Sequence, residues 1–475
     1  MTRTSLLALL LAATSVHAES WWPQFRGPGG LGIATGDAPI EFSPDKNVRW
    51  KVSVPSGHSS PCIWEDKIVL TGLDSGQLIT FCVSRADGRE LWRAVAPAAK
   101  IENAHRIGSP ASPTPCTDGQ RVYAYFGSFG VLAYDWQGRE VWRKPLPAPV
   151  VEFGTGASPI VVDGKVIVVA DQDVGSYMVA LDAVTGAEVW RVDRSEFRRG
   201  FSTPFVWRHG KDAELVVAGS LWVRGYDLKD GKQRWSARGM ARVSNATPVA
   251  AEDVLLVSSW NVGGDEDDRV EMEPFEAFAA ASDANKDGAF TKDEFPKGPV
   301  KDRFSQMDAD KDGLVTKAEY EYMRGMFAEA ANQLFAIKPG GSGDITKSHV
   351  AWQVNRHLPY VSSPVVARGR VFTMKNGGLA SAYDARSGSP IYQAERVEAS
   401  GDYYSSAVTC GNRIYVTSQR GTVVVLDAAS DTLNVLARNE LREQVFASPA
   451  IVDSVLYLRT EKHLFAFGVV GSGAP

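Results

Sequence analysis

The chain has 475 residues, 44% of them hydrophobic and 23% charged, and it carries a formal net charge of −5. These proportions are ordinary for a well-packed globular protein. The sequence has no long basic run and no arginine-rich stripe, which argues against nucleic acid as a partner.

Residues 1–18 have the features of a secretory signal peptide. Arg3 precedes an apolar run from Leu6 to Ala13, and small residues lead to Ala18 before a polar start. The run is too short to span a bilayer, and cleavage is expected after Ala18. We therefore predict an exported, soluble protein, periplasmic or secreted, that is monomeric and has no membrane span.

After an N-terminal segment over residues 19–46, short apolar runs alternate with turns in a repeating pattern. A small residue followed by proline marks the repeats at Pro61, Pro113, Pro159, Pro204, Pro248, Pro364 and Pro449, and Ala407 fills the same place in one repeat. The marks are 42–52 residues apart, except for one interval of 116 residues. Four short strands per repeat of this length are typical of a propeller blade. We predict an all-β fold, an eight-bladed β-propeller of four-stranded antiparallel blades.

Most repeats place a glycine-containing turn before a tryptophan, as in DAVTGAEVW (182–190) and DLKDGKQRW (227–235), and DARSGSPIY (384–392) and DAASDTLNV (427–435) are weaker copies. The glycines suit a turn position with positive φ. We expect each tryptophan to pack between neighbouring sheets, with its N–H bonded to the backbone.

The two ends of the repeat region complement each other. The last repeat, residues 448–467, has only three strands, whereas NVRWKV (47–52) carries Trp50 without a repeat of its own. Pairing these segments would close the ring and remove its open edges. The propeller is thus predicted over residues 47–263 and 332–475, with 47–52 as the closing strand.

The repeat resembles that of the PQQ-type β-propeller proteins, which include quinoprotein dehydrogenases and the non-enzymatic outer-membrane assembly propeller. WPQFRGPGG (22–30) also resembles the opening of a secreted bacterial subgroup of these proteins. The resemblance implies the fold more specifically than the activity, because one fold hosts many functions.

The four cysteines show no CxxC pair and no zinc-site spacing. An oxidising compartment would permit disulfides, so their state stays open, although free buried thiols are favoured. The residues are Cys62, Cys82, Cys116 and Cys410.

The long interval contains two copies of the calcium-loop pattern of an EF-hand, DANKDGAFTKDE (283–294) and DADKDGLVTKAE (308–319). Such a loop supplies oxygen ligands at alternate positions, a carbonyl at the seventh and a bidentate glutamate at the twelfth. We therefore predict two Ca²⁺ sites in an α-helical EF-hand pair over residues 264–331, with Phe290 and Val315 pairing the loops. The predicted ligands are Asp283, Asn285, Asp287, Ala289, Thr291 and Glu294 in the first loop, and Asp308, Asp310, Asp312, Leu314, Thr316 and Glu319 in the second.

The EF-hand pair falls between DVLLVSSW (253–260) and QLFAIK (333–338), the second and third strands of blade five. Loops at this position lie on the same face as the loops that join blades, and charged, His and Tyr residues gather in these loops. This face is a candidate binding funnel. Its candidate ligand-binding residues are His105, Arg106, Asp171, Asp173, Arg356, His357, Tyr360, Lys375, Tyr403 and Tyr404.

Two classes of function remain open. A PQQ-dependent dehydrogenase would hold PQQ in the funnel with a catalytic Asp and a calcium ion, but the chain lacks the adjacent Cys–Cys pair of those enzymes and any CxxCH haem motif. Another carbohydrate-active enzyme acting in the funnel is a further alternative. We favour a non-enzymatic binding or scaffold protein that takes a protein or saccharide-like ligand at the EF-hand face, with PQQ possible as a cofactor but not favoured and no catalytic residues assigned.

Overall fold

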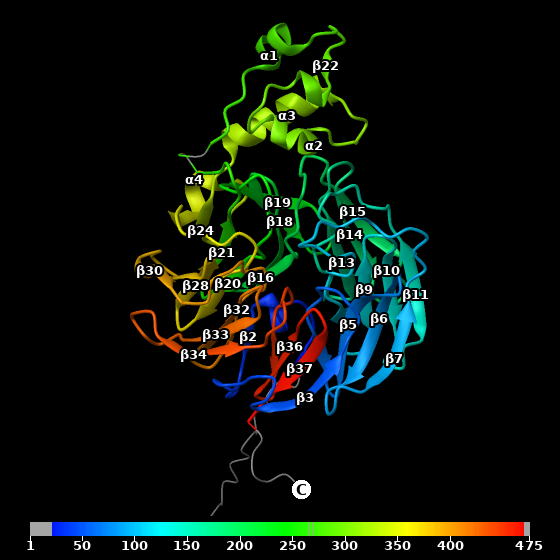
Figure 1. Cartoon of the computed structure of the whole chain (residues 1–475), viewed down its shortest axis with the longest axis vertical. Helices are drawn as coiled ribbons and strands as arrows, with labels where there is room; N and C mark the ends of the chain where they lie inside the picture. Colours follow the sequence, from blue (N-terminus) through cyan, green and yellow to red (C-terminus); the bar gives the residue numbers. More distant parts are fainter. Residues whose placement is uncertain (1–20, 266, 268, 470–475) are drawn as a thin grey trace, which may run out of the picture.

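The computed structural model describes residues 21–265, 267 and 269–469, so the predicted signal peptide lies outside the described residues. Its strands form eight four-stranded blades that follow one another in chain order around a ring (Figure 1). Within each blade the neighbouring strands run antiparallel. The predicted all-β, eight-bladed propeller is confirmed.

Every blade is built from four strands. Blade one contains β4 (Cys62–Trp64), β5 (Lys67–Asp74), β6 (Gln77–Ser84) and β7 (Glu90–Val95), and blade two contains β8 (Cys116–Thr117), β9 (Val122–Phe126), β10 (Gly130–Tyr134) and β11 (Glu140–Pro145). Blade three contains β12 (Ile160–Val162), β13 (Lys165–Ala170), β14 (Tyr177–Asp182) and β15 (Glu188–Asp193), and blade four contains β16 (Phe205–His209), β17 (Asp212–Ala218), β18 (Trp222–Asp227) and β19 (Gln233–Arg238). Blade five contains β20 (Val249–Ala251), β21 (Val254–Ser259), β24 (Gln333–Ile337) and β26 (Val350–Val354), and blade six contains β27 (Val365–Ala367), β28 (Arg370–Lys375), β29 (Leu379–Asp384) and β30 (Pro390–Arg396). Blade seven contains β31 (Val408–Cys410), β32 (Arg413–Thr417), β33 (Thr422–Asp427) and β34 (Val435–Glu440), and blade eight contains β35 (Ala450–Val452), β36 (Val455–Arg459), β37 (His463–Phe467) and β3 (Val48–Ser53).

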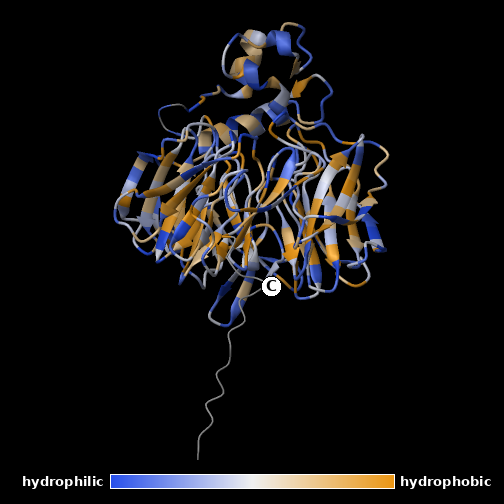
Figure 2. Ribbon diagram, turned by 60° about the horizontal axis from the view of Figure 1, so that its bottom comes forward, coloured by the Kyte–Doolittle hydropathy of each residue, from blue (hydrophilic) through white to orange (hydrophobic). Residues whose placement is uncertain are grey.

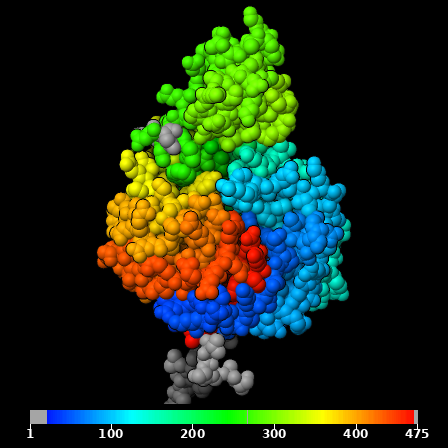
Figure 3. Space-filling view, in the orientation of Figure 1, coloured from blue at the N-terminus to red at the C-terminus, as the bar shows by residue number. Residues whose placement is uncertain are grey.

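Strand β3 closes the ring. It pairs antiparallel with β37, and Trp50 lies opposite Ala466. Figure 3 shows the first and last parts of the chain side by side on the surface. The closure expected from the sequence is therefore present, and the ring has no open blade edge at this junction.

The N-terminal segment adds contacts that the sequence pattern did not reveal. β1 (Trp21–Trp22) pairs with β4 of blade one, and β2 (Ile33–Ala34) pairs in parallel with β31 of blade seven. Between them, around the short helix η1 (Pro28–Gly30), the buried Arg26 donates from Nη2 to the Pro364 carbonyl of blade six at 2.5 Å. The segment thus joins blades on different sides of the ring, and Arg26 has carbonyl oxygens as its partners.

The tryptophans pack between sheets as expected. Trp142 of blade two lies against the turn of blade three, and its Nε1 donates to the Ala183 carbonyl at 3.1 Å. Four equivalent tryptophan N–H groups donate to backbone carbonyls of the next blade at 3.0–3.4 Å, those of Trp50, Trp92, Trp190 and Trp352.

Trp235 departs from this pattern. Its Nε1 donates to the Glu214 carboxylate of its own blade at 2.9 Å, not to a backbone oxygen. The outer edge of β19 is instead covered by β25 (Gly343–Asp344), which precedes helix α4 (Thr346–His349). The long connection between β24 and β26, which contains β25 and α4, stands where the other blades have a short turn to receive this tryptophan.

The proline mark predicted at Pro113 is displaced by two residues. Strand β8 begins at Cys116, so Thr114 and Pro115 take the place that Ser60 and Pro61 have before β4. The sequence SPASPTP offers three prolines in close succession, and only the start of the strand distinguishes them.

The EF-hand pair lies between β21 and β24, in blade five as predicted, and we refer to residues 264–331 as the EF-hand module. Figures 1 and 2 show it projecting from the propeller body. Its aromatic core forms a hydrophobic cluster of its own, which includes Phe290, Val315 and Tyr320. The module contains α1 (Phe275–Ser282), β22 (Ala289–Phe290), η3 (Lys292–Glu294), η4 (Lys301–Arg303), α2 (Phe304–Met307), β23 (Val315–Thr316) and α3 (Lys317–Glu329).

None of the helices in the described part of the chain is long and apolar enough to cross a membrane.

The four cysteines are all buried and free. Burial raises the pKa of the Cys82 thiol to about 12. Since the thiolate is the reactive form, these side chains act as small apolar core residues.

The stacking of tryptophan on glycine predicts a difference between two glycine substitutions. Gly164 (φ 69°) and Gly186 (φ 73°) both have positive φ, but a Cβ at Gly186 would lie 2.6 Å from Cε3 of Trp142, whereas a Cβ at Gly164 would meet open space. We expect Gly164→Ala to lower the free energy of unfolding by about 1 kcal/mol through backbone strain, and Gly186→Ala by roughly 2–3 kcal/mol. Equilibrium denaturation of both variants would measure the difference, and equal losses would contradict a role for the tryptophan contact.

Candidate functional site

A ring of eight hydroxyl groups surrounds the centre of the propeller. Each belongs to a serine or threonine two residues before the first strand of a blade, and each residue is only 2–4% exposed. At seven junctions the backbone N–H of one member donates to the hydroxyl oxygen of the next at 2.8–3.1 Å. A hydroxyl that accepts in this way keeps its own O–H as a donor. The members are Ser60, Thr114, Ser158, Thr203, Thr247, Ser363, Ser406 and Ser448.

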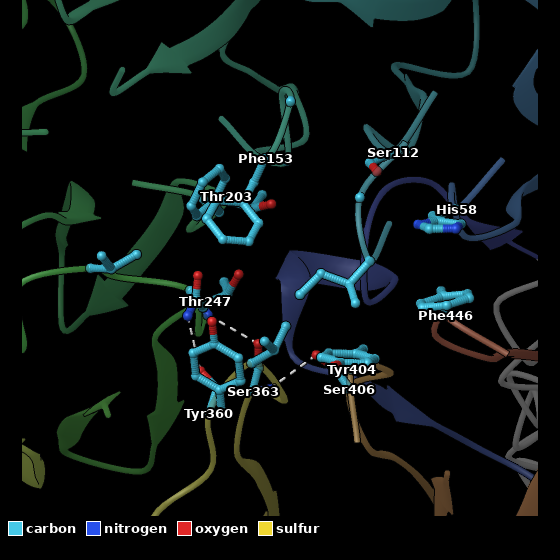
Figure 4. A pocket seen from close by; sticks show the side chains of 18 of the residues that line it. His58, Ser112, Phe153, Thr203, Thr247, Tyr360, Ser363, Tyr404, Ser406 and Phe446 are labelled. Atoms are coloured by element: carbon cyan, nitrogen blue, oxygen red, sulfur yellow. Dashed lines mark hydrogen bonds between the residues drawn. The ribbon is translucent and has the colours of Figure 1, made fainter. Parts of the chain in front are cut away.

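All eight hydroxyl residues line one cavity of about 280 Å³. Aromatic side chains from several inter-blade connections surround it (Figure 4). His58 and Phe446 stack with ring centroids 4.1 Å apart, and Tyr404 stacks on Phe446 at 5.7 Å. Phe153 and Tyr360 occupy other parts of the wall. Such a concave site with aromatic walls and a few fixed polar groups is typical of small-ligand binding.

The N-terminal segment and the EF-hand module both contribute to this cavity. Phe25 lines it from the N-terminal segment, whose dark blue ribbon crosses behind the cavity in Figure 4. Gln306 lines it from α2 of the module, and its Oε1 accepts a hydrogen bond from Arg242 Nη1 at 2.9 Å. The module therefore lies on the same face as the inter-blade loops, which is the face predicted from the sequence.

The basic side chains of the lining are two arginines and one histidine. Arg199 and Arg242 line the cavity, and among the residues described the lining has no aspartate or glutamate. Burial, with the charge of Arg459, lowers the pKa of His58 to about 3, so this imidazole is neutral at physiological pH.

Four carboxylates outside the lining contact lining side chains: Asp173 and Glu152 pair with Arg199, and Glu102 and Asp402 accept from hydroxyl groups. Glu102 accepts a hydrogen bond from Thr155 Oγ1 at 3.0 Å, and burial raises its pKa to about 7. Asp402 accepts from the Tyr404 hydroxyl at 3.2 Å. None of the four carboxyl groups itself lines the cavity.

The structure brings two of the ten candidate ligand-binding residues into the cavity wall, Tyr360 and Tyr404. His105 lies against Phe153 of the wall with ring centroids 4.8 Å apart, and Arg106 is exposed nearby. Arg356 is exposed and His357 is half-buried with φ 60°.

The remaining candidates have structural partners. Asp171 forms a buried ion pair with Arg194 at 2.6 Å, and Asp173 forms one with Arg199 at 2.6 Å. The buried Tyr403 donates to the Ala399 carbonyl at 2.6 Å. Lys375 is half-buried at the end of β28 and is not part of the cavity lining.

Several lining residues were not singled out from the sequence. The hydroxyl ring carries a usable signal, because six members precede the predicted proline mark of their repeat, Ser406 precedes Ala407, and Thr114 precedes Pro115 at the displaced mark. The others stand in loops of varied length without a common motif, and folding alone brings them together. They are Phe25, Phe153, Phe201 and Phe446, with Gln306 of helix α2, whereas His58, Arg199 and Arg242 belong to inter-blade loops that the sequence already placed on this face.

The first calcium loop is folded around its carboxylates. Asp283 accepts from the N–H groups of Lys286 and Gly288, at 2.6 and 3.1 Å, and Asp287 accepts from Ala289 N at 2.9 Å. Glu294 accepts from Ala284 N at 3.1 Å, which draws the end of the loop to its start. This is the arrangement that an EF-hand loop uses to direct oxygens inward.

The second loop has the same arrangement, and its carboxylate oxygens also cluster closely enough to hold one metal ion. Carboxylate oxygens of Asp308, Asp310 and Asp312 all lie within 4.8 Å of one another. Asp308 Oδ1 is buried without a hydrogen-bond partner, and Glu319 accepts from Ala309 N at 2.8 Å. A buried oxygen that lacks a donor beside two further carboxylates fits a bound cation, and an all-oxygen set suits Ca²⁺.

The two loops are joined as the sequence predicts. Phe290 pairs with Val315 and Ala289 with Thr316 in a two-stranded antiparallel sheet. Backbone pairing therefore couples the geometry of one loop to that of the other.

The cavity does not fit the calcium-assisted use of PQQ that the resemblance to dehydrogenases implies. A calcium ion on the cofactor and a catalytic Asp both require carboxylates at the site, and the described lining has none. The carboxylates that fit Ca²⁺ are in the EF-hand loops instead.

Comparison with known proteins agrees with the fold. A family profile described as "Outer membrane protein assembly factor BamB" matches residues 76–264 and 377–468, and an EF-hand profile matches residues 300–321. The chain is 28% identical over 288 residues, 54% of its length, to quinohemoprotein alcohol dehydrogenase ADH IIB of Pseudomonas putida. It is 29% identical over 140 residues, 29% of its length, to BamB of Alkalilimnicola ehrlichii. These matches span only 39% and 33% of the two relatives.

Solved structures share the fold at low identity. BamB from Moraxella catarrhalis aligns with a TM-score of 0.56 and 14% identity over 90% of this chain and 99% of that one. Quinohemoprotein alcohol dehydrogenase ADHIIG from Pseudomonas putida HK5 aligns with a TM-score of 0.58 and 12% identity over 96% and 81%. Because the BamB profile matches more than half of the sequence, the chain belongs to the PQQ-like β-propeller family described by that name.

Proposed function

We propose that this protein is a non-enzymatic binding protein that holds a saccharide-like ligand in its central cavity. The observation that carries the proposal is the lining itself, which combines eight hydroxyl groups and several aromatic rings without a described carboxylate. Hydroxyls that already accept from the backbone offer their O–H groups to ligand oxygens, and flat rings offer apolar faces. Both features suit the two kinds of surface that a sugar ring presents.

The arrangement of the aromatic rings supports the same proposal. Phe446 lies between His58 and Tyr404 in a stacked series, so this part of the wall is held rigid before any ligand arrives. A preorganised wall loses little conformational entropy on binding. A protein ligand would have to enter the cavity with a single loop or side chain, since the volume is only about 280 Å³.

Calcium forms the second part of the proposal. We infer that both EF-hand loops bind Ca²⁺, because each folds its predicted ligands around a common centre. We also propose that the protein acts as a monomer after export to the periplasm or the medium, where calcium is available.

We expect changes in the aromatic wall to weaken binding without loss of fold. Truncation of a central aromatic side chain removes contact area that other residues cannot replace, so Phe446→Ala should weaken binding of a trisaccharide by roughly tenfold or more. Isothermal titration with a panel of neutral and uronate-containing trisaccharides would measure this. Trp222→Ala is the matched control, because Trp222 packs under Arg238 outside the cavity lining. Equal affinities in the two variants, or no binding to the wild type, would contradict the proposed function.

A PQQ-dependent oxidoreductase is the second candidate. Its support is the 28% identity to a quinohemoprotein alcohol dehydrogenase over 54% of this chain. Dye-linked oxidation of alcohols with added PQQ and Ca²⁺ separates the two proposals. We expect no PQQ-dependent turnover, and turnover would favour the dehydrogenase.

A further inference from the structure

Arg242 lines the cavity without a charged partner. It lies between β19 and β20, donates from Nη1 to Gln306 Oε1, and stands 5.5 Å from the centre of the Phe327 ring. Its Nε is buried and has no hydrogen-bond partner, and no ion pair in the described chain includes this guanidinium. Arg242 itself is half-buried, and its positive charge has no carboxylate in the described chain to balance it, so a negatively charged group from outside the chain would stabilise it.

The surroundings of Arg242 do not supply the missing negative charge. Arg199 lines the same cavity, but the carboxylates beside it, Asp173 and Glu152, are already paired with it at 2.6 and 2.9 Å. Lys311 of the second calcium loop lies 3.7 Å from Asp173 as well. Burial, followed by the charges of Arg303 and Arg199, lowers the pKa of Arg242 to about 10, so it stays protonated at neutral pH. This end of the cavity therefore has an excess of positive charge.

We propose that Arg242 and Gln306 form a subsite for a carboxylate of the ligand, so that the ligand is an acidic, uronate-containing saccharide. This inference rests on the proposed function of the cavity and specifies the ligand. A guanidinium presents parallel N–H groups that match a carboxylate, and Arg242 is a lining residue whose guanidinium has no carboxylate partner in the described chain. The hydroxyl ring and the aromatic wall serve the remaining, uncharged part of a sugar better than the side chains of an acidic peptide.

The subsite is shared between the propeller and the EF-hand module. Gln306 belongs to α2, a helix of four residues that ends one residue before Asp308, the first ligand position of the second loop. Lys311 of the same loop donates to the carbonyls of Ser305 and Asp308 and approaches Asp173 behind Arg199. Calcium in this loop therefore fixes the side chain that orients Arg242, and acid recognition depends on calcium.

The test compares uronate trisaccharides with their methyl esters, which have the same rings but no charge. Isothermal titration of the mature protein in calcium should give a preference for the acid of roughly tenfold or more, because a hydrogen bond to a charged group contributes more than a neutral one. Arg242→Gln should abolish the preference, because the loss of the guanidinium charge should weaken acid binding by a much larger factor than ester binding. Gln306→Ala, or EDTA with the wild type, should reduce the preference in the same direction.

The matched control is Arg238→Gln. Arg238 lies at the end of β19, pairs with Glu329 at the surface and does not line the cavity, so its variant should retain the acid preference. Melting curves of each variant establish that the fold is intact. Ester binding without an acid preference would overturn this inference alone, whereas no binding of either form would overturn the proposed function. Tighter binding of a hexaglutamate peptide than of the uronate would overturn the assignment to an acidic saccharide.

Discussion

A chain that begins at Val54, and so lacks β1, β2 and β3, should fail to form a stable closed ring. The deletion removes the outer strand of blade eight and leaves β37 as an open edge. It also removes the pairings of β1 with β4 and of β2 with β31, together with buried Trp22 and Phe42. Loss of three strands and part of a core exceeds the ~4–5 kcal/mol that is exceptional for a single substitution. We expect aggregation, or a melting transition far below that of the mature protein.

A chain that begins at Trp21 is the control, because it keeps every described strand. Thermal unfolding and size-exclusion chromatography of the two chains would measure the difference. A Val54 chain that is monomeric and melts with the control would show that the ring closes without its N-terminal strands.

The fold could be predicted from the sequence because the signals that specify it lie within short segments and recur in successive repeats. Turn glycines such as Gly186 need positive φ, and tryptophans such as Trp142 recur at a fixed offset from them, so that each repeat confirms the others. The EF-hand loops are equally local, since Asp308 and Glu319 belong to one run of twelve residues. The displaced proline mark at Pro113 arose where three prolines compete within one short stretch.

The face of the propeller on which the cavity lies could be predicted from the sequence, but most of the residues that line the cavity could not. The sequence indicated the correct face, because the EF-hand insertion and the inter-blade loops must share it. The sequence did not indicate that Asp171 forms a buried ion pair with Arg194, or that Arg242 has no carboxylate partner in the described chain. The Asp171–Arg194 ion pair joins two segments of blade three that are 23 positions apart, and no sequence motif identifies it.

The contacts of the N-terminal segment could not be predicted from the sequence either. Residues 19–46 show no repeat, yet Arg26 reaches the Pro364 carbonyl across 338 positions of sequence, and Phe25 lines the cavity. A chain that crosses the centre of a ring makes contacts set by the ring as a whole. The motif WPQFRGPGG carries these residues, but its contacts exist only after the blades are assembled.

Removal of calcium should destabilise the EF-hand module and leave the propeller intact. The module has a hydrophobic cluster of its own, and Leu221 of the propeller packs against it. Without a cation the carboxylates of Asp308, Asp310 and Asp312 repel one another within 4.8 Å. At a calcium concentration 100-fold above the dissociation constant, binding adds about 2.7 kcal/mol to the folded module. Calorimetry should therefore resolve a chelator-sensitive transition of residues 264–331 below an unchanged propeller transition.

The glutamates at the twelfth loop positions separate the contributions of the two loops. Glu294→Gln and Glu319→Gln each remove one bidentate ligand. In calcium, each variant should therefore lose part of the stabilisation that calcium gives the module, and in EDTA each should melt like the wild type. Glu276→Gln is the matched control, since Glu276 pairs with Lys317 at the surface of the module outside both loops. If only Glu319→Gln alters the transition, the first loop does not bind calcium under these conditions. If EDTA collapses the propeller as well, the docking of α2 and Gln306 against Arg242 braces the ring itself, and the module is not an autonomous insertion.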